Sequence, residues 1–320
     1  MKDINVAVLL SVYNGEKYLE AQLDSILSQS YDCVINIYIR NDGSSDSSES
    51  IIRNYTGKYE NIHFMDNQDN LGCARSFFEL LFLVRSDYYF FCDQDDVWHT
   101  DKIRNTLALY GNDDTLPILA HTDLNIVDEE LNVTCDSFYK FQKLNPEIGM
   151  NKNKIVIQNY IVGCTICINE PMKQLLDQDF IINNADKIAM HDWWVALCAV
   201  FFAEVRFHNE PSIDYRQHNS NVLGAKDNSL SRYLRSFLTA KESRKRVLNF
   251  TNKVSSQAEA FGVCYENSLD SDDKKLVNLA TAFKVDRGFR NMFDLQFVKG
   301  LRMQGVKRNL ALLYTALILK

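Results

Sequence analysis

The sequence predicts an α/β protein with a mostly parallel sheet covered by helices on both faces, followed by a C-terminal helical extension. Apolar runs alternate with helix-length amphipathic stretches through the first hundred residues, which is the pattern of βαβ units. Strand-like runs disappear after about residue 225, where apolar residues recur with a helical period. The charge balance reverses at the same place. We therefore expect two domains, 1–225 and 226–320.

The individual elements follow from the positions of these runs. In the first hundred residues we predict strands at 4–11, 34–40, 61–66 and 87–92, and helices at 16–29, 45–55 and 72–85. Ser44 or Ser45 is expected to cap the second helix and Asn70 the third. Further on we predict strands at 117–122, 155–162, 164–168, 204–207 and 212–216, and helices at 170–178 and 192–202. The last helices are expected at 229–262, 271–284 and 287–319.

The charges are unevenly distributed behind a formal net charge of −7. Residues 1–225 hold 17 basic and 33 acidic side chains, whereas residues 226–320 hold 18 and 9. The acidic total argues against general binding of nucleic acid. The eight cysteines are scattered, several of them in apolar runs, as expected for reduced thiols of a cytoplasmic protein. The first apolar run, Val6 to Leu10, is too short for a signal peptide.

The C-terminal stretch 284–320 combines eight basic and two acidic side chains with interleaved apolar residues. None of its apolar runs approaches the roughly 20 residues that span a bilayer. A basic amphipathic helix is drawn to anionic lipid, which predicts peripheral contact with the inner face of the cell membrane. The apolar face can equally pack on the first domain, so both interpretations stay open.

One acidic cluster follows a predicted buried strand. The aromatic run from Tyr88 leads directly into Asp93, Asp95 and Asp96, while the glycine-rich phosphate loops GxGxxG and GxxxxGK[ST] are absent. In an extended chain Asp93 and Asp95 point the same way, and clustered carboxylates repel unless a cation compensates. Hard oxygen ligands favour Mg²⁺ or Mn²⁺. The alternative is a solvated turn in which Asp96 caps a helix.

Several short motifs occur in order along the first 225 residues. They are Val8-Leu9-Leu10-Ser11-Val12-Tyr13-Asn14-Gly15, Arg40-Asn41-Asp42-Gly43-Ser44-Ser45-Asp46, Asn70-Leu71-Gly72-Cys73-Ala74-Arg75 and Asp93-Gln94-Asp95-Asp96. Together they resemble the motifs of glycosyltransferase family 2, whose members are inverting enzymes of the GT-A fold. Two later motifs, Met190-His191-Asp192-Trp193-Trp194 and Tyr215-Arg216-Gln217-His218-Asn219, resemble the bacterial branch that includes rhamnosyltransferases of surface-polysaccharide assembly.

The resemblance implies a role for each matching residue. The residues implied in binding the donor nucleotide are Ser11, Tyr13, Asp42, Arg75 and Asp93. Asp95, with Asp93 and His218, would hold Mg²⁺ or Mn²⁺, and Asp192 would be the catalytic base. The residues implied in contacts with the donor sugar or the acceptor are Asp96, Trp98, His191 and Trp193. Structural alternatives stay open, among them a turn at Asp42, an N-cap at Asp192 and core packing of the tryptophans.

These features predict an enzyme that moves a sugar from a nucleoside diphosphate to a saccharide. The resemblance implies dTDP-rhamnose or a UDP-hexose as the donor and a saccharide acceptor, expected to be lipid-linked, in polysaccharide assembly. The alternative is a catalytically degenerate protein that binds nucleotide sugars or carbohydrates. A sugar-nucleotide pyrophosphorylase is disfavoured because no glycine-rich basic loop stands near the N-terminus.

Overall fold

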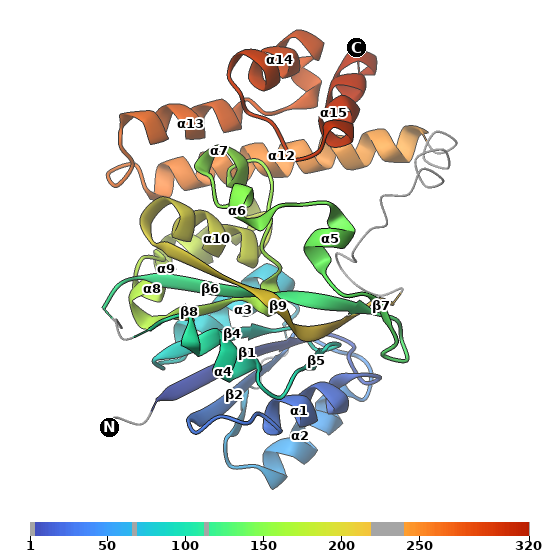
Figure 1. The fold of residues 1–320 in the computed structure, drawn as a ribbon, viewed down its shortest axis with the longest axis vertical. Coiled ribbons are helices and arrows are strands. Elements are labelled where there is room, and N and C mark those ends of the chain that lie inside the picture. Colours follow the sequence, from blue (N-terminus) through green and yellow to red (C-terminus); the bar gives the residue numbers. More distant parts are fainter. Residues whose placement is uncertain (1–3, 66–68, 112–114, 219–239, 320) are drawn as a thin grey trace. The chain divides into compact units, whose positions relative to one another are not determined.

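The computed structural model describes residues 4–65, 69–111, 115–218 and 240–319 (Figure 1). The chain forms two compact units and passes between them more than once. Unit 1 comprises residues 1–140, 161–182 and 190–225, and unit 2 comprises residues 141–160, 183–189 and 226–320. The expected domain boundary near 225 lies outside the described residues.

Unit 1 is built on a sheet that has nine strands within the described residues, in the order β3-β2-β1-β4-β8-β6-β9-β5, with β7 paired to β6. The strands are β1 (Asn5–Val12), β2 (Val34–Asn41), β3 (Ile62–Met65), β4 (Tyr88–Cys92), β5 (Val97–Trp98), β6 (Ile118–Val127), β7 (Val133–Cys135), β8 (Cys167–Asn169) and β9 (Glu204–Arg216). β3, β2, β1 and β4 are parallel, as are β6 and β9, while β8 is antiparallel to both of its neighbours. The four strands predicted in the first hundred residues are confirmed.

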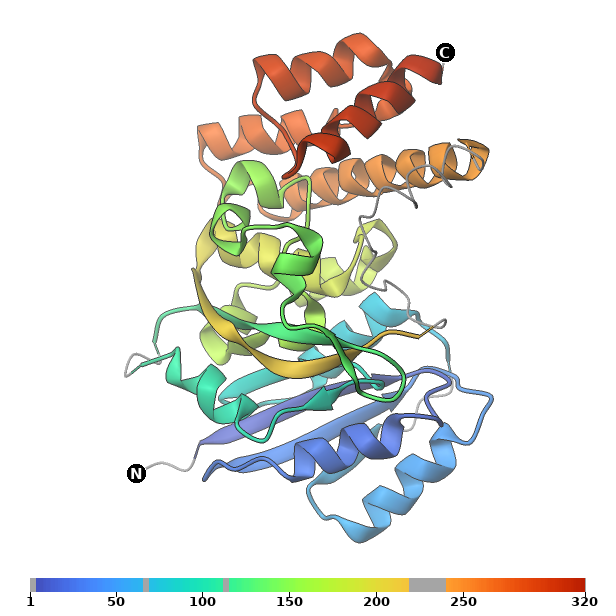
Figure 2. The ribbon, with the colours of Figure 1, turned by 45° about the vertical axis from the view of Figure 1, so that its right-hand side comes forward.

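Helices cover both faces of this sheet (Figures 1 and 2). The helical elements of unit 1 are α1 (Leu19–Leu27), α2 (Ser48–Lys58), α3 (Cys73–Leu83), α4 (Lys102–Ala108), η1 (Gly163–Thr165), α8 (Glu170–Gln174), α9 (Gln178–Asn183) and α10 (His191–Phe202). α1 and α2 lie along one face, and α3 and α10 along the other (Figure 1). Because it is covered on both sides, β1 is buried over Val6 to Leu10, which explains its unbroken apolar run.

The helix caps differ from the prediction. α2 begins after Ser47 and α3 after Gly72, so Ser44, Ser45 and Asn70 are not the capping residues. The Ser44 N–H instead donates to the Asn41 side chain within the same turn. The Ser45 N–H donates to the Asn14 side chain, which ties the loop after β2 to the loop after β1. Ser44 and Ser45 therefore stabilise the loop before α2 and do not cap the helix.

Three predictions of longer elements are also wrong. Residues 155–162 form no strand, because α7 (Lys152–Ile155) ends there and irregular chain follows. Residues 204–207 and 212–216 belong to one strand, β9, whose register on β6 shifts beside Pro211. The helix expected over 287–319 is broken at Gly300 and Gly305, which have φ values of 72° and 89°. Such positive φ values interrupt a right-handed helix.

Unit 2 is helical. Its elements are α6 (Pro146–Gly149), α7, η2 (Ala185–Lys187), α12 (Ala240–Cys264), α13 (Ser271–Thr281), η3 (Val285–Arg287), α14 (Phe289–Phe293), η4 (Asp294–Val298) and α15 (Val306–Ile318), while α5 (Phe138–Gln142) lies where the chain first leaves unit 1. Lys152 pairs with Asp273 at 2.7 Å, and the Gln304 N–H donates to the Gln158 side chain at 2.9 Å. The segment 141–160 therefore shares one unit with the C-terminal helices. Within the described ranges, no helix is both long and apolar enough to cross a membrane.

Candidate active site

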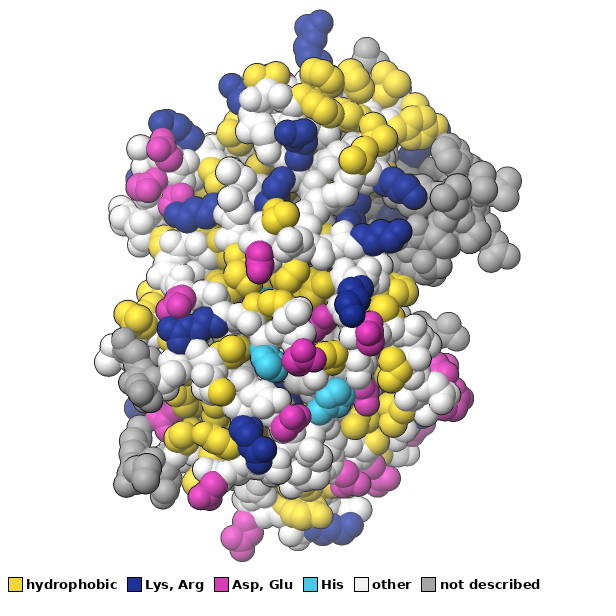
Figure 3. Space-filling view, viewed as in Figure 1, with side chains coloured by type: hydrophobic (Ala, Val, Ile, Leu, Met, Phe, Trp, Pro, Cys, Tyr) yellow, Lys and Arg dark blue, Asp and Glu magenta, His cyan; other side chains and the backbone are white. Residues whose placement is uncertain are grey.

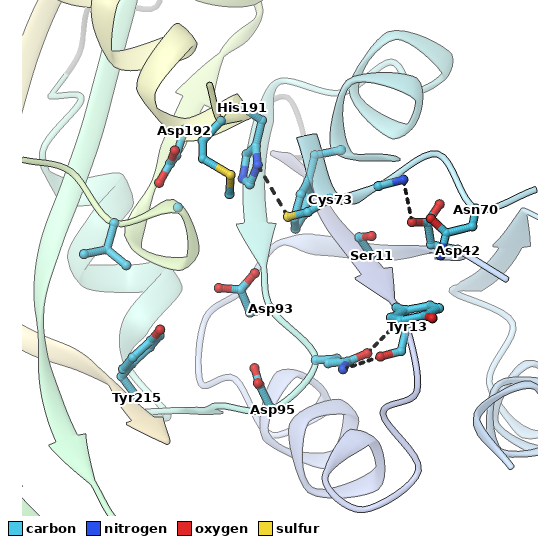
Figure 4. Close-up of a pocket in the computed structure, with 16 residues that line it drawn as sticks. Ser11, Tyr13, Asp42, Asn70, Cys73, Asp93, Asp95, His191, Asp192 and Tyr215 are labelled. Atoms are coloured by element: carbon cyan, nitrogen blue, oxygen red, sulfur yellow. Dashed lines mark hydrogen bonds between the residues drawn. The ribbon is translucent and has the colours of Figure 1, made fainter. Parts of the chain in front are cut away.

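A cavity of about 500 Å³ opens at the carboxyl ends of β1, β2 and β4. Ligands of open α/β sheets bind at this edge, beyond the ends of parallel strands. Figure 4 shows Asp93 and Asp95 between Tyr13 on one side and Asp192 on the other. The residues predicted from the sequence that line this cavity are Ser11, Tyr13, Asp42, Asp93, Asp95, His191 and Asp192.

Asp42, at the end of β2, is held by three donors. Its carboxylate is paired with the Arg40 guanidinium and accepts the backbone N–H groups of Leu71 at 2.8 Å and Gly72 at 2.9 Å. The positive φ of Gly72, 77°, is a conformation that glycine adopts without strain. Both charged side chains are almost fully buried, at 1% and 3% exposure for Arg40 and Asp42. Two oxygens offer about four acceptor positions, so one position remains for a ligand in the cavity.

The loop after β1 is tied to the acidic loop after β4. The Tyr13 N–H donates to Gln94 Oε1 at 2.7 Å, and Gln94 Nε2 donates to the Tyr13 carbonyl at 2.9 Å (Figure 4). Ser11 Oγ lies 2.7 Å from Ser76 Oγ on α3. The backbone around Tyr13 is therefore held from the acidic loop, while its ring stays exposed at the cavity.

Asp93 and Asp95 form the acidic floor of the cavity. Burial, and then repulsion by Asp95 and Asp192, raise the pKa of Asp93 to about 7. Asp95 Oδ2 lies 2.7 Å from His218 Nε2, which places His218 beside the carboxylates although its side chain does not line the cavity. Two carboxylates and an imidazole, with negative charge in excess, are a donor set that suits Mg²⁺ or Mn²⁺.

Asp96 lies beneath this floor and does not line the cavity. It is fully buried and accepts the Arg216 N–H at 3.1 Å, and burial with repulsion by Asp95 and Asp93 raises its pKa well above the ordinary value. The ligand atoms of Asp93, Asp96 and Cys164 lie within 4.8 Å of one another. Arg216 also donates through Nε to the Asp95 carbonyl at 3.0 Å, so β9 fixes the acidic loop from below.

Asp192 and His191 begin α10 on the far wall of the cavity (Figure 4). The N-cap of α10 is Met190, so Asp192 does not cap the helix, and its carboxylate accepts the Trp193 N–H at 2.6 Å. His191 packs against the Phe77 ring at 4.1 Å, and burial lowers its pKa to about 3. It is therefore a neutral imidazole.

The His191 ring is held from two sides. Cys73 Sγ lies 3.9 Å from Nδ1, and burial together with the surrounding carboxylates raises the pKa of the Cys73 thiol, which stays protonated. A Cβ on Gly163 would lie 3.0 Å from His191 Nε2. Only a residue without a side chain leaves this ring undisturbed.

Three further residues predicted from the sequence are engaged elsewhere. Arg75 is partly exposed and pairs with Glu79 along α3 at 3.5 Å. Trp98 is buried against Phe90, and Trp193 is buried in α10. None of the three lines the cavity.

Arg40, Gln94 and Cys73 were not predicted as site residues. A charged residue inside the buried end of β2 was the available signal for Arg40, because a buried charge needs a partner. Gln94 stands between the acidic residues, and nothing in its spacing indicates that it reaches Tyr13, 81 positions away.

Proteins similar to this chain indicate its family. The model of the family described as glycosyl transferase family 2 matches residues 7–176, more than half of the chain. A dTDP-rhamnosyl transferase, RfbG of Shigella flexneri, is 29% identical over 77% of this chain and 84% of its own. An uncharacterized glycosyltransferase of Rickettsia typhi is 22% identical over 97% of this chain and 95% of its own.

Solved structures match over nearly the whole chain. TarS of S. aureus in complex with UDP-GlcNAc has a TM-score of 0.53 at 14% identity, covering 98% of this chain and 90% of its own. The mannosyltransferase PcManGT of Pyrobaculum calidifontis, in complex with GDP-Man and Mn²⁺, has a TM-score of 0.53 at 12% identity, covering 99% and 87%. Both have the GT-A fold, which confirms the predicted fold class. The chain belongs to glycosyltransferase family 2.

Proposed function

We propose that this protein is an inverting glycosyltransferase that uses a nucleoside-diphosphate sugar. The observation that carries the proposal is the single cavity in which Asp192 faces the carboxylates of Asp42, Asp93 and Asp95. One end of this cavity offers hydrogen-bond acceptors for a nucleobase, and the other offers the Asp192 carboxylate, which is not the N-cap of α10 and accepts the Trp193 N–H. A single displacement at the anomeric carbon needs these two ends within reach of one substrate.

Asp192 is the proposed base. Its carboxylate would accept the proton of an acceptor hydroxyl while that oxygen attacks the anomeric carbon and the nucleoside diphosphate departs. His191, neutral and held between Cys73 and Phe77, would orient the start of α10 beside it. The remaining acceptor position on Asp42 would take the imide N–H of a uracil or thymine.

The donor set favours a divalent cation at Asp93, Asp95 and His218. Burial, and then repulsion by Asp95 and Asp192, raise the pKa of Asp93, and a cation bound there would offset that repulsion. Asp96 and Cys164 are sealed beneath the loop and do not face the cavity, which favours Asp95 as the ligand. When bound, Mg²⁺ or Mn²⁺ supplies positive charge against the leaving diphosphate.

The proposed donor is dTDP-rhamnose or a UDP-hexose. Similarity to the dTDP-rhamnosyl transferase RfbG supports rhamnose, and the UDP-GlcNAc complex of TarS supports a UDP-sugar. We propose a saccharide acceptor carried on a lipid, in cell-surface polysaccharide assembly. The protein would act in the cytoplasm at the inner face of the membrane, with 284–320 in contact with it.

Substitutions in the cavity test the reaction. Asp192→Asn should remove sugar transfer while leaving donor binding by calorimetry intact, and Asp95→Ala should remove metal-dependent nucleotide release. Asp186→Asn makes the same charge change at an exposed position and should be active. Full transfer by purified Asp192→Asn enzyme would refute the base assignment.

A catalytically degenerate binding protein is the alternative. It would bind a nucleotide sugar without releasing nucleotide from any donor, with or without acceptor. A screen of dTDP-rhamnose and UDP-hexoses with Mn²⁺, Mg²⁺ or a chelator separates these outcomes. Release that requires the cation supports the transferase.

A further inference from the structure

Unit 2 carries an exposed row of apolar side chains on its last helices. They are Phe289, Phe293, Phe297, Val298, Val306, Leu310, Tyr314 and Leu317, which are between 38% and 75% exposed. We call this set the apolar ridge. Figure 3 shows hydrophobic side chains gathered over α14 and α15, with Lys and Arg side chains around them.

The ridge is distinct from the apolar face that each helix packs into the core of unit 2. Met292 and Leu295 are buried beneath α14 and η4, and Leu312 and Ala316 beneath α15. Most of the exposed residues recur four positions apart, at 289, 293 and 297 and at 306, 310 and 314, away from these buried side chains. A surface helix normally places polar residues there.

The aromatic part of the ridge is ordered. The rings of Phe289 and Phe293 lie 5.9 Å apart, and those of Phe293 and Phe297 lie 4.9 Å apart. The Arg302 guanidinium lies over the Phe297 ring at 5.5 Å. Three neighbouring aromatic rings with a cation at the end form a continuous surface, and continuous exposed apolar surface marks a docking site.

The charges beside the ridge indicate what docks there. Arg290, Lys299, Arg302 and Lys307 are exposed in these elements, against two acidic residues, Asp286 and Asp294, in the same stretch. Lysine is depleted in protein interfaces, whereas apolar side chains flanked by Lys and Arg suit an anionic lipid surface.

We propose that the apolar ridge inserts into the headgroup region of an anionic lipid bilayer, with the flanking cations on lipid phosphates. This deepens the membrane contact proposed above by naming the surface, and its physical basis does not depend on sugar transfer. The helices would lie in the plane of the interface, as no described helix is able to span it.

Vesicle flotation of the full chain tests the proposal. The protein should float with phosphatidylcholine vesicles that contain phosphatidylglycerol, and much less with phosphatidylcholine alone or at high salt. The variant Phe293→Ser/Phe297→Ser/Leu310→Ser should weaken binding on the order of tenfold to a hundredfold, because three half-exposed apolar side chains no longer enter the lipid.

A matched control distinguishes the ridge from general hydrophobicity. Leu83→Ser/Leu116→Ser/Val263→Ser removes equally exposed apolar side chains outside the ridge and should bind vesicles like the unmodified protein. Replacing Arg290, Lys299 and Arg302 by Gln should remove the preference for anionic lipid. Melting temperatures of all variants should stay close to that of the parent, since the changed side chains are exposed.

Two results would overturn the proposal: no flotation of the unmodified protein with anionic vesicles, or equal flotation of the ridge variant. A dimer in sedimentation velocity that the ridge variant abolishes, without vesicle binding, would assign the ridge to a second copy of the chain. Nucleotide release and transfer to a water-soluble acceptor should be unchanged in the ridge variants. Loss of flotation and loss of transfer are therefore measured separately.

Discussion

The buried pair of Arg40 and Asp42 allows a quantitative test of the end of the cavity that we propose binds the nucleotide. Replacing Arg40 by Met removes a guanidinium that is 1% exposed and leaves the Asp42 carboxylate with two backbone donors. Breaking a buried pair by removing one partner costs about 3–5 kcal/mol, since a charge stays buried without compensation. For a chain of this size, this loss lowers the melting temperature by about 5–7 °C.

The double variant Arg40→Met/Asp42→Asn contains neither buried charge. We expect it to be more stable than Arg40→Met alone, with a coupling energy of up to about 3 kcal/mol between the two sites. Arg53→Met, which breaks an exposed pair with Glu49, should change stability by less than about 1 kcal/mol.

Urea unfolding followed by circular dichroism measures five proteins, namely the parent, Arg40→Met, Asp42→Asn, the double variant and Arg53→Met. Calorimetry measures donor binding. If Arg40→Met costs no more than Arg53→Met, or if the two substitutions add without coupling, the carboxylate is not held as the structure indicates. Donor affinity should fall in Arg40→Met only if the Asp42 carboxylate has moved. The binding measurement therefore separates a displaced carboxylate from a protein that is less stable but has an unchanged site.

Other predictions concern pH and the wall of the cavity. The 2.9 Å contact with Asp214 raises the pKa of His99. The contribution of this pair to the stability of the fold is therefore complete below the ordinary histidine pKa and is lost as the pH rises through the raised value. Melting curves of His99→Gln should lack this pH dependence. Mn²⁺ affinity should fall below about pH 7, where protons compete for Asp93, and calorimetry on Asp93→Asn should show a flatter profile. Gly163→Ala should lower transfer about tenfold by displacing the His191 ring, with little change in melting temperature; unchanged turnover would contradict this.

The hydrophobic periodicity of short segments predicted the strands and helices of the first hundred residues. The strands and helices of the first hundred residues each carry their own apolar signature, and the acidic cluster stands directly after one of them. The apolar run 155–162 has no period that separates a strand from irregular buried chain, so it was assigned wrongly. Gly300 and Gly305 were available as signals for the broken C-terminal helix.

Contacts between distant positions could not be predicted in this way. The pairing of Lys152 with Asp273 and of Gln158 with Gln304 places 141–160 with the C-terminal helices, and no periodicity indicates such partners. The same holds for the site. Asp42 stood out as an acid after a strand, but the Leu71 and Gly72 N–H groups that orient it come from a loop about 30 residues further along.

The double hydrogen bond between Gln94 and the Tyr13 backbone has a thermodynamic consequence. It joins the loop after β1, which we propose faces the nucleoside, to the loop that carries Asp93 and Asp95, so a displacement of one loop also displaces the other. Two ligands that bind to the joined loops should then influence each other, and the influence must be equal in both directions. The factor by which the cation raises the affinity for the nucleotide must equal the factor by which the nucleotide raises the affinity for the cation. Gln94→Ala should bring that factor toward one.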